Sequence, residues 1–207
     1  MKIKLCTSII IFLLFSSTCF AQSDIVKTIS AVADSSLTSY LQVIPSGQES
    51  FYGFNSREEF VLAKVGKPYQ IFTFSKEFFT DSNVSNKNYL IATNEFRVAV
   101  TVNGENRILL TVGNMNGKWQ VVGIGAAFFA KELAGYEKIY ATPNDEGMIL
   151  RVYQLKSDFY ITTSDMKAIP LGSAKLAFGM NNSTDTPSYS LQQVTSLIKD
   201  KLGNNKY

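Results

Sequence analysis

The sequence predicts an α+β fold in which helices pack on an antiparallel β-meander sheet. Two Asn-Gly pairs, Asn103-Gly104 and Asn116-Gly117, separate three runs that are rich in β-branched and apolar residues. Asn and Gly tolerate positive φ and favour tight hairpin turns, so the three runs should form neighbouring antiparallel strands. One long amphipathic stretch precedes this region and another ends the chain, and each needs a sheet face on which to bury its apolar stripe. We therefore expect the helices to pack on one side of the sheet.

The N-terminal helix is predicted from Asp24 to about Ile44, because apolar residues recur there at steps of three and four. A Pro-Ser-Gly sequence then ends it. A second, shorter helix should begin at Ser56, where Ser56 and Glu59 form a capping-box pattern, and should end at Gly66. The first half thus contributes a long helix and a short inserted one.

The strands of the first half follow from alternation of apolar and polar residues. An extended stretch with two partly apolar faces is expected at 69–74, and the three strands of the meander are expected at 96–102, 107–112 and 119–124. Residues 80–88, which are rich in Ser, Asn and Asp, are expected to form an exposed loop. These segments make the centre of the sheet.

The second half alternates helices and strands. A short helix is predicted at 126–133, closed by Gly135, and extended segments are predicted at 138–142, 148–155, 159–163 and 174–178. Residues 181–188 form a polar linker. The last helix should start at Ser190, with Gln193 completing a capping box, and should end at Gly203.

Residues 1–21 predict a cleavable signal peptide. Lys2 and Lys4 give a basic start, an apolar run covers 5–15, and the small residues Cys19 and Ala21 fit the cleavage pocket, so we expect cleavage between Ala21 and Gln22. The apolar run has about 11 residues, whereas a membrane-spanning helix needs about 20. No later stretch is apolar enough to serve as a transmembrane anchor. We expect one globular α+β domain at 22–207, exported to the periplasm or secreted, and the Ala-Gln ending favours a bacterial origin.

The composition of the chain after cleavage excludes several kinds of chemistry. The chain has no His, and its two cysteines, Cys6 and Cys19, belong to the signal peptide. A disulfide, a Ser-His-Asp triad and an ordinary zinc, copper or haem site are therefore excluded. Lys2 and Lys4 also leave, so 18 basic residues face 17 acidic ones, and this balance argues against binding to nucleic acid. We expect no cofactor, no metal site and no catalytic residue.

Three patterns of reactive residues have structural interpretations that compete with chemistry. Gly123-Ile124-Gly125 lacks the third glycine of a dinucleotide fingerprint and is interpreted as a bend between strand and helix. Two S-x-x-K matches, at 164–167 and 196–199, lack the partner motifs of penicillin-binding enzymes. Adjacent carboxylates at Glu58-Glu59 and Asp145-Glu146 leave open a carboxylate-dependent hydrolase that acts on extracellular glycans.

The function expected from these observations is a non-catalytic binding domain for a protein or a cell-envelope partner. Phe51, Tyr52 and Phe54 lie in a connecting segment and are the candidate partner surface, since aromatic residues on loops anchor interfaces. Core packing is the competing interpretation of these aromatics. The alternative functions are the glycan hydrolase and a carrier of a small apolar ligand between sheet and helices.

Overall fold

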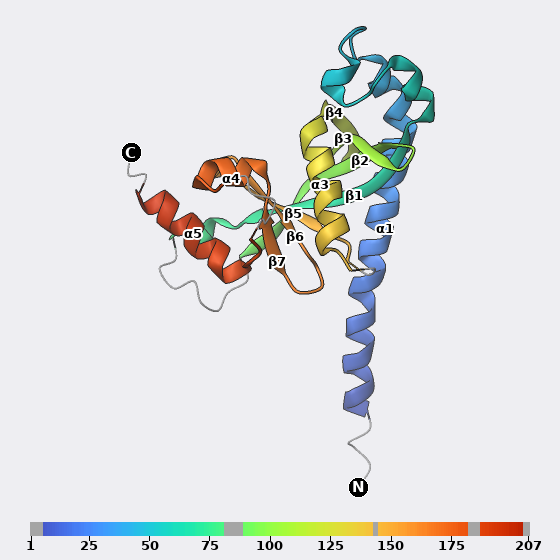
Figure 1. The fold of residues 1–207 in the computed structure, drawn as a ribbon. Coiled ribbons are helices and arrows are strands. Elements are labelled where there is room, and N and C mark those ends of the chain that lie inside the picture. Colours follow the sequence, from blue (N-terminus) through green and yellow to red (C-terminus); the bar gives the residue numbers. More distant parts are fainter. Residues whose placement is uncertain (1–5, 81–88, 143–144, 182–186, 205–207) are drawn as a thin grey trace.

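The computed structural model describes the backbone of residues 6–80, 89–142, 145–181 and 187–204, and the side chains of these segments between Asp24 and Gly203. Within these segments the chain is α+β, with helices packed on one mostly antiparallel sheet (Figure 1). The strands are β1 (Lys64–Phe74), β2 (Leu90–Val102), β3 (Glu105–Met115), β4 (Lys118–Gly125), β5 (Met148–Val152), β6 (Ser157–Ile161), β7 (Lys167–Pro170) and β8 (Tyr189–Ser190). The α-helices are α1 (Cys6–Gln42), α2 (Lys76–Thr80), α3 (Ala127–Tyr140), α4 (Gly172–Phe178) and α5 (Leu191–Asn204), and the short 3-10 helices are η1 (Glu49–Tyr52), η2 (Arg57–Leu62) and η3 (Tyr153–Leu155).

The sheet consists of two antiparallel sections joined by one parallel contact. The strand order is β4-β3-β2-β1-β5-β6-β7-β8. The parallel contact between β1 and β5 comprises two residue pairs, Ile71 with Ile149 and Phe72 with Leu150. The first section is therefore a meander of β1 to β4, and the second is built from β5 to β8.

The meander predicted from the two Asn-Gly pairs is confirmed. Asn103 and Gly104 have φ angles of 52° and 81°, and Asn116 and Gly117 have φ angles of 55° and 82°. Positive φ at both central residues produces the tight turn whose twist matches that of paired strands. β2, β3 and β4 accordingly pair in antiparallel order.

One face of the first section, which we call the α1 face, is covered by α1. Successive side chains of a strand point to opposite faces, so the even-numbered residues of β2 and β3 share the face toward α1. They form a single buried cluster with the apolar stripe of the helix, which comprises Ile29, Ala33, Leu37, Leu41, Ile44, Phe96, Val98, Val100, Val102, Ile108, Leu110 and Val112. The predicted helical stripe thus forms this half of the core.

The same face of the second section is covered by α2, α4 and α5. Leu150 and Phe159, which pair across β5 and β6, belong to a buried cluster that includes Phe78 of α2, Ala174 of α4 and Val194 of α5. The helix α5 begins as predicted: the backbone N–H of Ser190 donates to Gln193 Oε1 at 2.8 Å, and the N–H of Gln193 donates to Ser190 Oγ at 3.2 Å. This reciprocal pair is the capping box predicted from the sequence.

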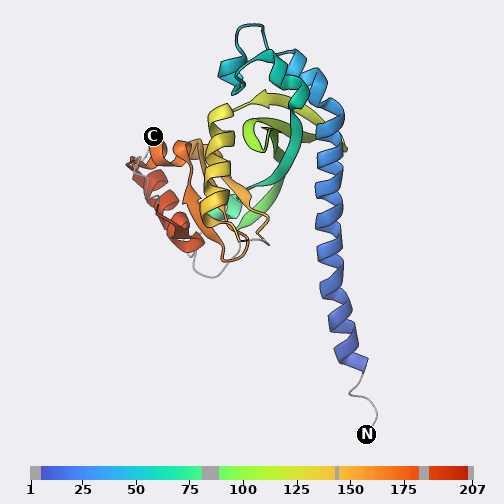
Figure 2. The same ribbon diagram turned by 45° about the vertical axis from the view of Figure 1, so that its right-hand side comes forward.

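The opposite face of the sheet, which we call the α3 face, is covered by α3 (Figure 2). Ala130, Leu133 and Tyr136 of α3 pack on the odd-numbered strand residues. The buried strand residues of this cluster are Tyr69, Ile71, Ala99, Leu109, Ile149 and Ile169, together with Tyr160 from β6. The expectation that the helices pack on one side is therefore wrong: both faces of the central strands are apolar enough to bury a helix.

Three predictions for the second half are also wrong. Residues 138–142, predicted to be extended, begin within α3, which ends at Tyr140. The helix α3 passes through Gly135 and continues to Tyr140, although an internal glycine costs about 1 kcal/mol relative to alanine. The burial of Tyr136 and its edge-on contact with Tyr140, at 5.9 Å between ring centroids, hold the last turns in place. Residues 174–178, predicted to be extended, belong to α4, where Ala174 is buried and Gly179 closes the helix with φ +67°.

The helix predicted from Ser56 forms as the 3-10 helix η2 and without a capping box. Ser56 makes no side-chain cap, and Glu59 accepts hydrogen bonds from the backbone and side-chain nitrogens of Asn55, both at 2.7 Å. Gly66 does not end a helix but lies within β1. The competing contact with Asn55 explains why the pattern did not produce the predicted cap.

Several predicted segments fall partly outside the described residues. Thr80 ends α2, whereas the rest of the predicted loop up to Asn88 is not described. The same holds for most of the polar linker at 181–188. The N-terminal part of α1 projects away from the sheet (Figures 1 and 2). Among the described helices, none is both long and apolar enough to cross a membrane.

Candidate functional site

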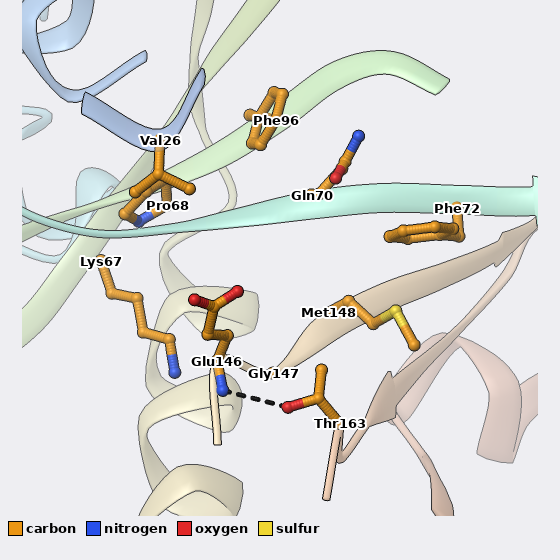
Figure 3. Close-up of a pocket in the computed structure, with 10 residues that line it drawn as sticks. All are labelled: Val26, Lys67, Pro68, Gln70, Phe72, Phe96, Glu146, Gly147, Met148 and Thr163. Carbon is orange, nitrogen blue, oxygen red and sulfur yellow. Dashed lines mark hydrogen bonds between the residues drawn. The ribbon is translucent and has the colours of Figure 1, made fainter. Parts of the chain in front are cut away.

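A half-open pocket lies at the junction between the two sections of the sheet, on the α1 face. Its volume is about 120 Å³. Figure 3 shows its lining, which comes from α1, from neighbouring strands, and from the loop before β5 and the residues after β6, which lie side by side. The lining residues are Val26, Lys67, Pro68, Gln70, Phe72, Phe96, Glu146, Gly147, Met148 and Thr163.

The walls of the pocket are mainly apolar. They lie on the α1 face, between the cluster beneath α1 and the cluster beneath α5. Val26 lies about midway along α1, and Met148 belongs to the cluster beneath α5. Phe72 and Phe96 come from the strands between these two helices and share their face. The gap between the two helix-covered halves therefore becomes a pocket with an aromatic floor.

A bulge in β1 brings Lys67 to the rim. The register of β1 against β2 shifts between Val65 and Pro68, so Lys67 departs from the regular alternation. Its Nζ forms an ion pair with Glu137 of α3 and donates a hydrogen bond to the backbone oxygen of Asp145 at 3.2 Å. Lys67 thereby ties the last turns of α3 to the loop that forms the opposite rim.

Asp145 holds that loop in position. Its Oδ1 accepts hydrogen bonds from the N–H of Gly147 at 3.0 Å and from the N–H and Oγ1 of Thr163 at 2.7 and 2.8 Å, and its Oδ2 accepts from Ser164 Oγ at 3.0 Å. Burial acts to raise the pKa of this carboxyl group, but the hydrogen bonds outweigh burial and the net pKa is lowered. Asp145 is therefore a structural anion that fixes the rim.

The loop also depends on the absence of a side chain at Gly147. This residue has φ +58°, and a Cβ atom there would lie 2.6 Å from the hydroxyl of Tyr160. Both the backbone angle and the close approach favour glycine. Next to it, the N–H of Glu146 donates to Thr163 Oγ1 at 3.2 Å, and the Glu146 carboxylate points toward the pocket (Figure 3).

The volume and the mainly apolar walls of this pocket suit an apolar group. Glu146 is the one carboxylate in the lining, whereas general acid–base hydrolysis of glycans needs two facing carboxylates. No group of three or more acidic, Cys or His residues that could hold a metal occurs in the described part of the chain. A cavity of about 150 Å³ holds a benzene molecule, so about 120 Å³ holds a group the size of one apolar side chain.

The aromatic residues predicted as a partner surface are separated by the fold. Phe51 of η1 is 82% exposed and Tyr52 is half-buried, whereas Phe54 is 1% exposed and packs edge-on against Phe60 at 4.9 Å between centroids. Phe54 therefore belongs to the core beneath α1 and is not available as a surface residue. Phe51 remains the exposed member of the predicted surface.

The other candidate patterns have structural roles or separate partners. Glu59 forms an ion pair with Arg107 at 3.2 Å. In the first S-x-x-K match, Ser164 bonds Asp145, and Lys167 pairs with Asp165 at 2.7 Å. Residues 123–125 end β4 before α3, as the bend interpretation predicted.

The second S-x-x-K match is likewise accounted for within α5. Ser196 donates to the backbone oxygen of Gln192 at 3.1 Å, and the Lys199 ammonium lies 5.2 Å from the centre of the Phe78 ring. Cleavage between Ala21 and Gln22 stays a prediction, because nothing in the fold tests it. The side chains of both residues precede those that the structure describes.

Sequence reasoning missed the pocket because its walls come from distant segments. Val26, Phe72 and Met148 are far apart along the chain. The parallel contact of β1 with β5 brings Phe72 and Met148 together, and the packing of α1 on the sheet adds Val26. Pro68 was a usable signal, since proline within a strand indicates an edge or a bulge. Comparison of the chain with protein-family models, with curated proteins and with solved structures found no match.

Proposed function

We propose that the chain is an exported, non-catalytic binding domain that captures a partner protein by taking one apolar side chain of the partner into the pocket between α1 and β5. The observation that carries this proposal is the half-open apolar pocket of about 120 Å³. Small-molecule sites usually measure about 300–1,000 Å³, so the size favours a single anchoring side chain. Export rests on the N-terminal sequence, and the projection of the beginning of α1 away from the sheet supports removal of that segment.

The chemistry of the rim supports a peptide as the source of the anchor. Lys67 and Glu146 carry opposite charges at the mouth, and Gln70 and Thr163 add neutral hydrogen-bonding groups. Protein interfaces place an apolar anchor at the centre and polar groups around it. Transfer of such a side chain from water into the pocket should contribute about 1.5–3 kcal/mol to binding.

The first experiment fills the pocket from one wall. Val26→Phe adds an aromatic ring where α1 meets the pocket, and Val43→Phe is the matched control, because Val43 is an exposed residue outside the pocket. A photo-crosslinking amino acid at position 70, which lines the pocket, should trap one partner protein through an apolar residue of that partner. We expect Val26→Phe to weaken this capture at least tenfold, in line with the burial energy of one side chain, while Val43→Phe retains it.

Two outcomes would contradict the proposal. If Val26→Phe and Val43→Phe captured the partner equally well, the partner would contact a surface other than the pocket. Loss of capture in Phe51→Ser would then identify the exposed aromatic residue of η1 as the contact. Release of a small apolar molecule from the purified protein, with no protein crosslinked at position 70, would instead support the ligand-carrier function.

A further inference from the structure

A second hollow, which we call the α3–α4 hollow, lies where the first turns of α3 meet α4. Its volume is about 680 Å³, and it shares no lining residue with the pocket between α1 and β5. The two ends of α4 contribute Gly172 and Gly179 to the lining. A Cβ atom at Gly172 would lie 3.4 Å from Phe128 Cε1 and 3.5 Å from Glu132 Oε2, so the backbone of α4 passes close to both side chains.

The lining of this hollow includes two of the most exposed large apolar side chains among the described residues. Phe128 of α3 is 77% exposed and Leu176 of α4 is 86% exposed. Single exposed apolar residues are ordinary on a protein surface, but these two belong to one concave surface, together with the half-buried Met180. Exposed apolar side chains that gather around a hollow are typical of an interaction surface.

The hollow also contains charges of both signs that are not paired with each other. The two carboxylate oxygens of Glu132 accept from the N–H of Gly172 at 2.8 and 3.0 Å, and Oε1 also accepts from the Tyr136 hydroxyl at 3.3 Å. Among the described residues no cation forms an ion pair with Glu132. Lys175 of α4 lies in the same lining. A carboxylate has about four acceptor sites, so Glu132 can still accept from a cation.

The exposure of the apolar side chains favours a broad occupant over a small molecule. A small ligand lies within its site, which buries most of the ligand surface. Phe128 and Leu176 instead direct more than three-quarters of their surface to solvent. An occupant that covers them must therefore approach from outside, as the surface of another protein chain does.

The same features match a second copy of this surface. In a two-fold symmetric contact, residue i of one copy meets residue j of the other, and j meets i. Phe128 protrudes beside a hollow, so the Phe128 side chain of each copy can enter the hollow of the other. The same rotation brings the Glu132 carboxylate of each copy toward Lys175 of the other, so the charges complement each other without a net charge.

We propose that the chain forms a two-fold symmetric dimer through the α3–α4 hollow, in which Phe128 and Leu176 of each copy pack into the hollow of the other. The inference is independent of the proposed partner pocket, because the two linings share no residue.

The first test measures the dimer by sedimentation equilibrium of the wild-type protein, purified in the form that the cell produces. The average mass should rise from that of one chain toward that of two between about 1 and 500 µM, as mass action requires. Phe128→Ser should raise the dissociation constant about a hundredfold, because each buried ring contributes about tenfold and both copies lose one. Ile139→Ser is the matched control, since Ile139 is a 67% exposed residue of α3 outside the hollow, and it should leave the constant unchanged.

The second test locates the contact. A photo-crosslinking amino acid at position 176 should join two copies through residues of α3 or α4, whereas the same amino acid at position 139 should not. The mass of a single chain at every concentration would overturn the proposal. So would crosslinking of two copies at position 139 but not at 176, or equal weakening by Phe128→Ser and Ile139→Ser. Capture of a different protein or of a small molecule at position 176, without a second copy, would also overturn it.

Discussion

The two faces of β2 differ in how completely a helix covers them. Toward α1, the strand presents Val98 and Val100, which are fully buried. Toward α3, the same strand presents Ala99, which is buried, and then Arg97 and Glu95, which are partly exposed. The shorter helix α3 buries only part of its face, and charged side chains occupy the part beyond it. A face of this sheet is thus apolar only as far as a helix extends over it.

The largest effect is expected for substitutions that test whether a tightly packed hydrophobic core lies on each face of the sheet. Leu109 and Leu110 are adjacent, both buried, and point to opposite faces. Leu109→Ala and Leu110→Ala should each lower the free energy of unfolding by about 2–5 kcal/mol, because each leaves a cavity. Urea unfolding measures the loss, and Val122→Ala, at a half-exposed position, is the control. A loss below about 1 kcal/mol for either leucine would show that its face is loosely packed.

The next effect separates the two arginines of the α3 face. Arg151→Met leaves the Asp158 carboxylate, whose side chain is 10% exposed, without its bidentate partner. We expect a loss of about 1–3 kcal/mol, which is less than for a fully buried pair because both side chains retain some solvent contact. No carboxylate among the described residues forms an ion pair with Arg97, so Arg97→Met should change stability by less than about 1 kcal/mol. Equal losses in the two variants would refute the contrast between them.

A smaller effect concerns the acid stability of the pocket rim. The pKa of Asp145 is lowered in the folded protein, so its contribution is present above the unfolded pKa and is lost as pH falls through the folded one. Unfolding free energy should therefore decline as pH is lowered from about 5 toward 3, and Asp145→Asn should flatten this decline. Asp200→Asn is the control, because that carboxylate lies in α5, away from the loop 145–147. An unchanged slope in Asp145→Asn would exclude this residue as a source of acid sensitivity.

The smallest effect tests the start of α5 beneath the second section. Ser190→Ala removes the hydroxyl that accepts from the Gln193 N–H and should cost about 1 kcal/mol. Ser196→Ala, within the same helix, should be close to neutral because its hydroxyl bonds only a backbone oxygen of its own helix. Thermal unfolding of the two variants measures the difference, and equal midpoints would show that the cap contributes nothing.

Local signals predicted the first section well. Asn103-Gly104 and Asn116-Gly117 determine their turns through their own backbone angles, and the stripe from Ile29 to Ile44 needs only a sheet to cover it. Ser190 with Gln193 is equally local. These features depend on residues within a few positions of one another, which is the range that a single sequence reports.

Contacts between distant segments account for the failures. Gly135 remains helical because Tyr136 packs on the sheet, and Ser56 loses its predicted partner because Glu59 bonds Asn55 and Arg107. The pocket depends on the pairing of β1 with β5, which no local pattern encodes. Tertiary packing therefore overrode propensity where the two disagreed.

The narrow parallel contact between β1 and β5 also has a consequence for how the chain is made. Synthesis proceeds from the N-terminus, so all four strands of the first meander exist before residue 148 appears. Until β5 arrives, β1 presents an unpaired edge with apolar residues such as Ile71 and Phe72, and an open edge of this kind recruits strands from other copies. Aggregation during biosynthesis should therefore depend on how soon the second section emerges to cover that edge.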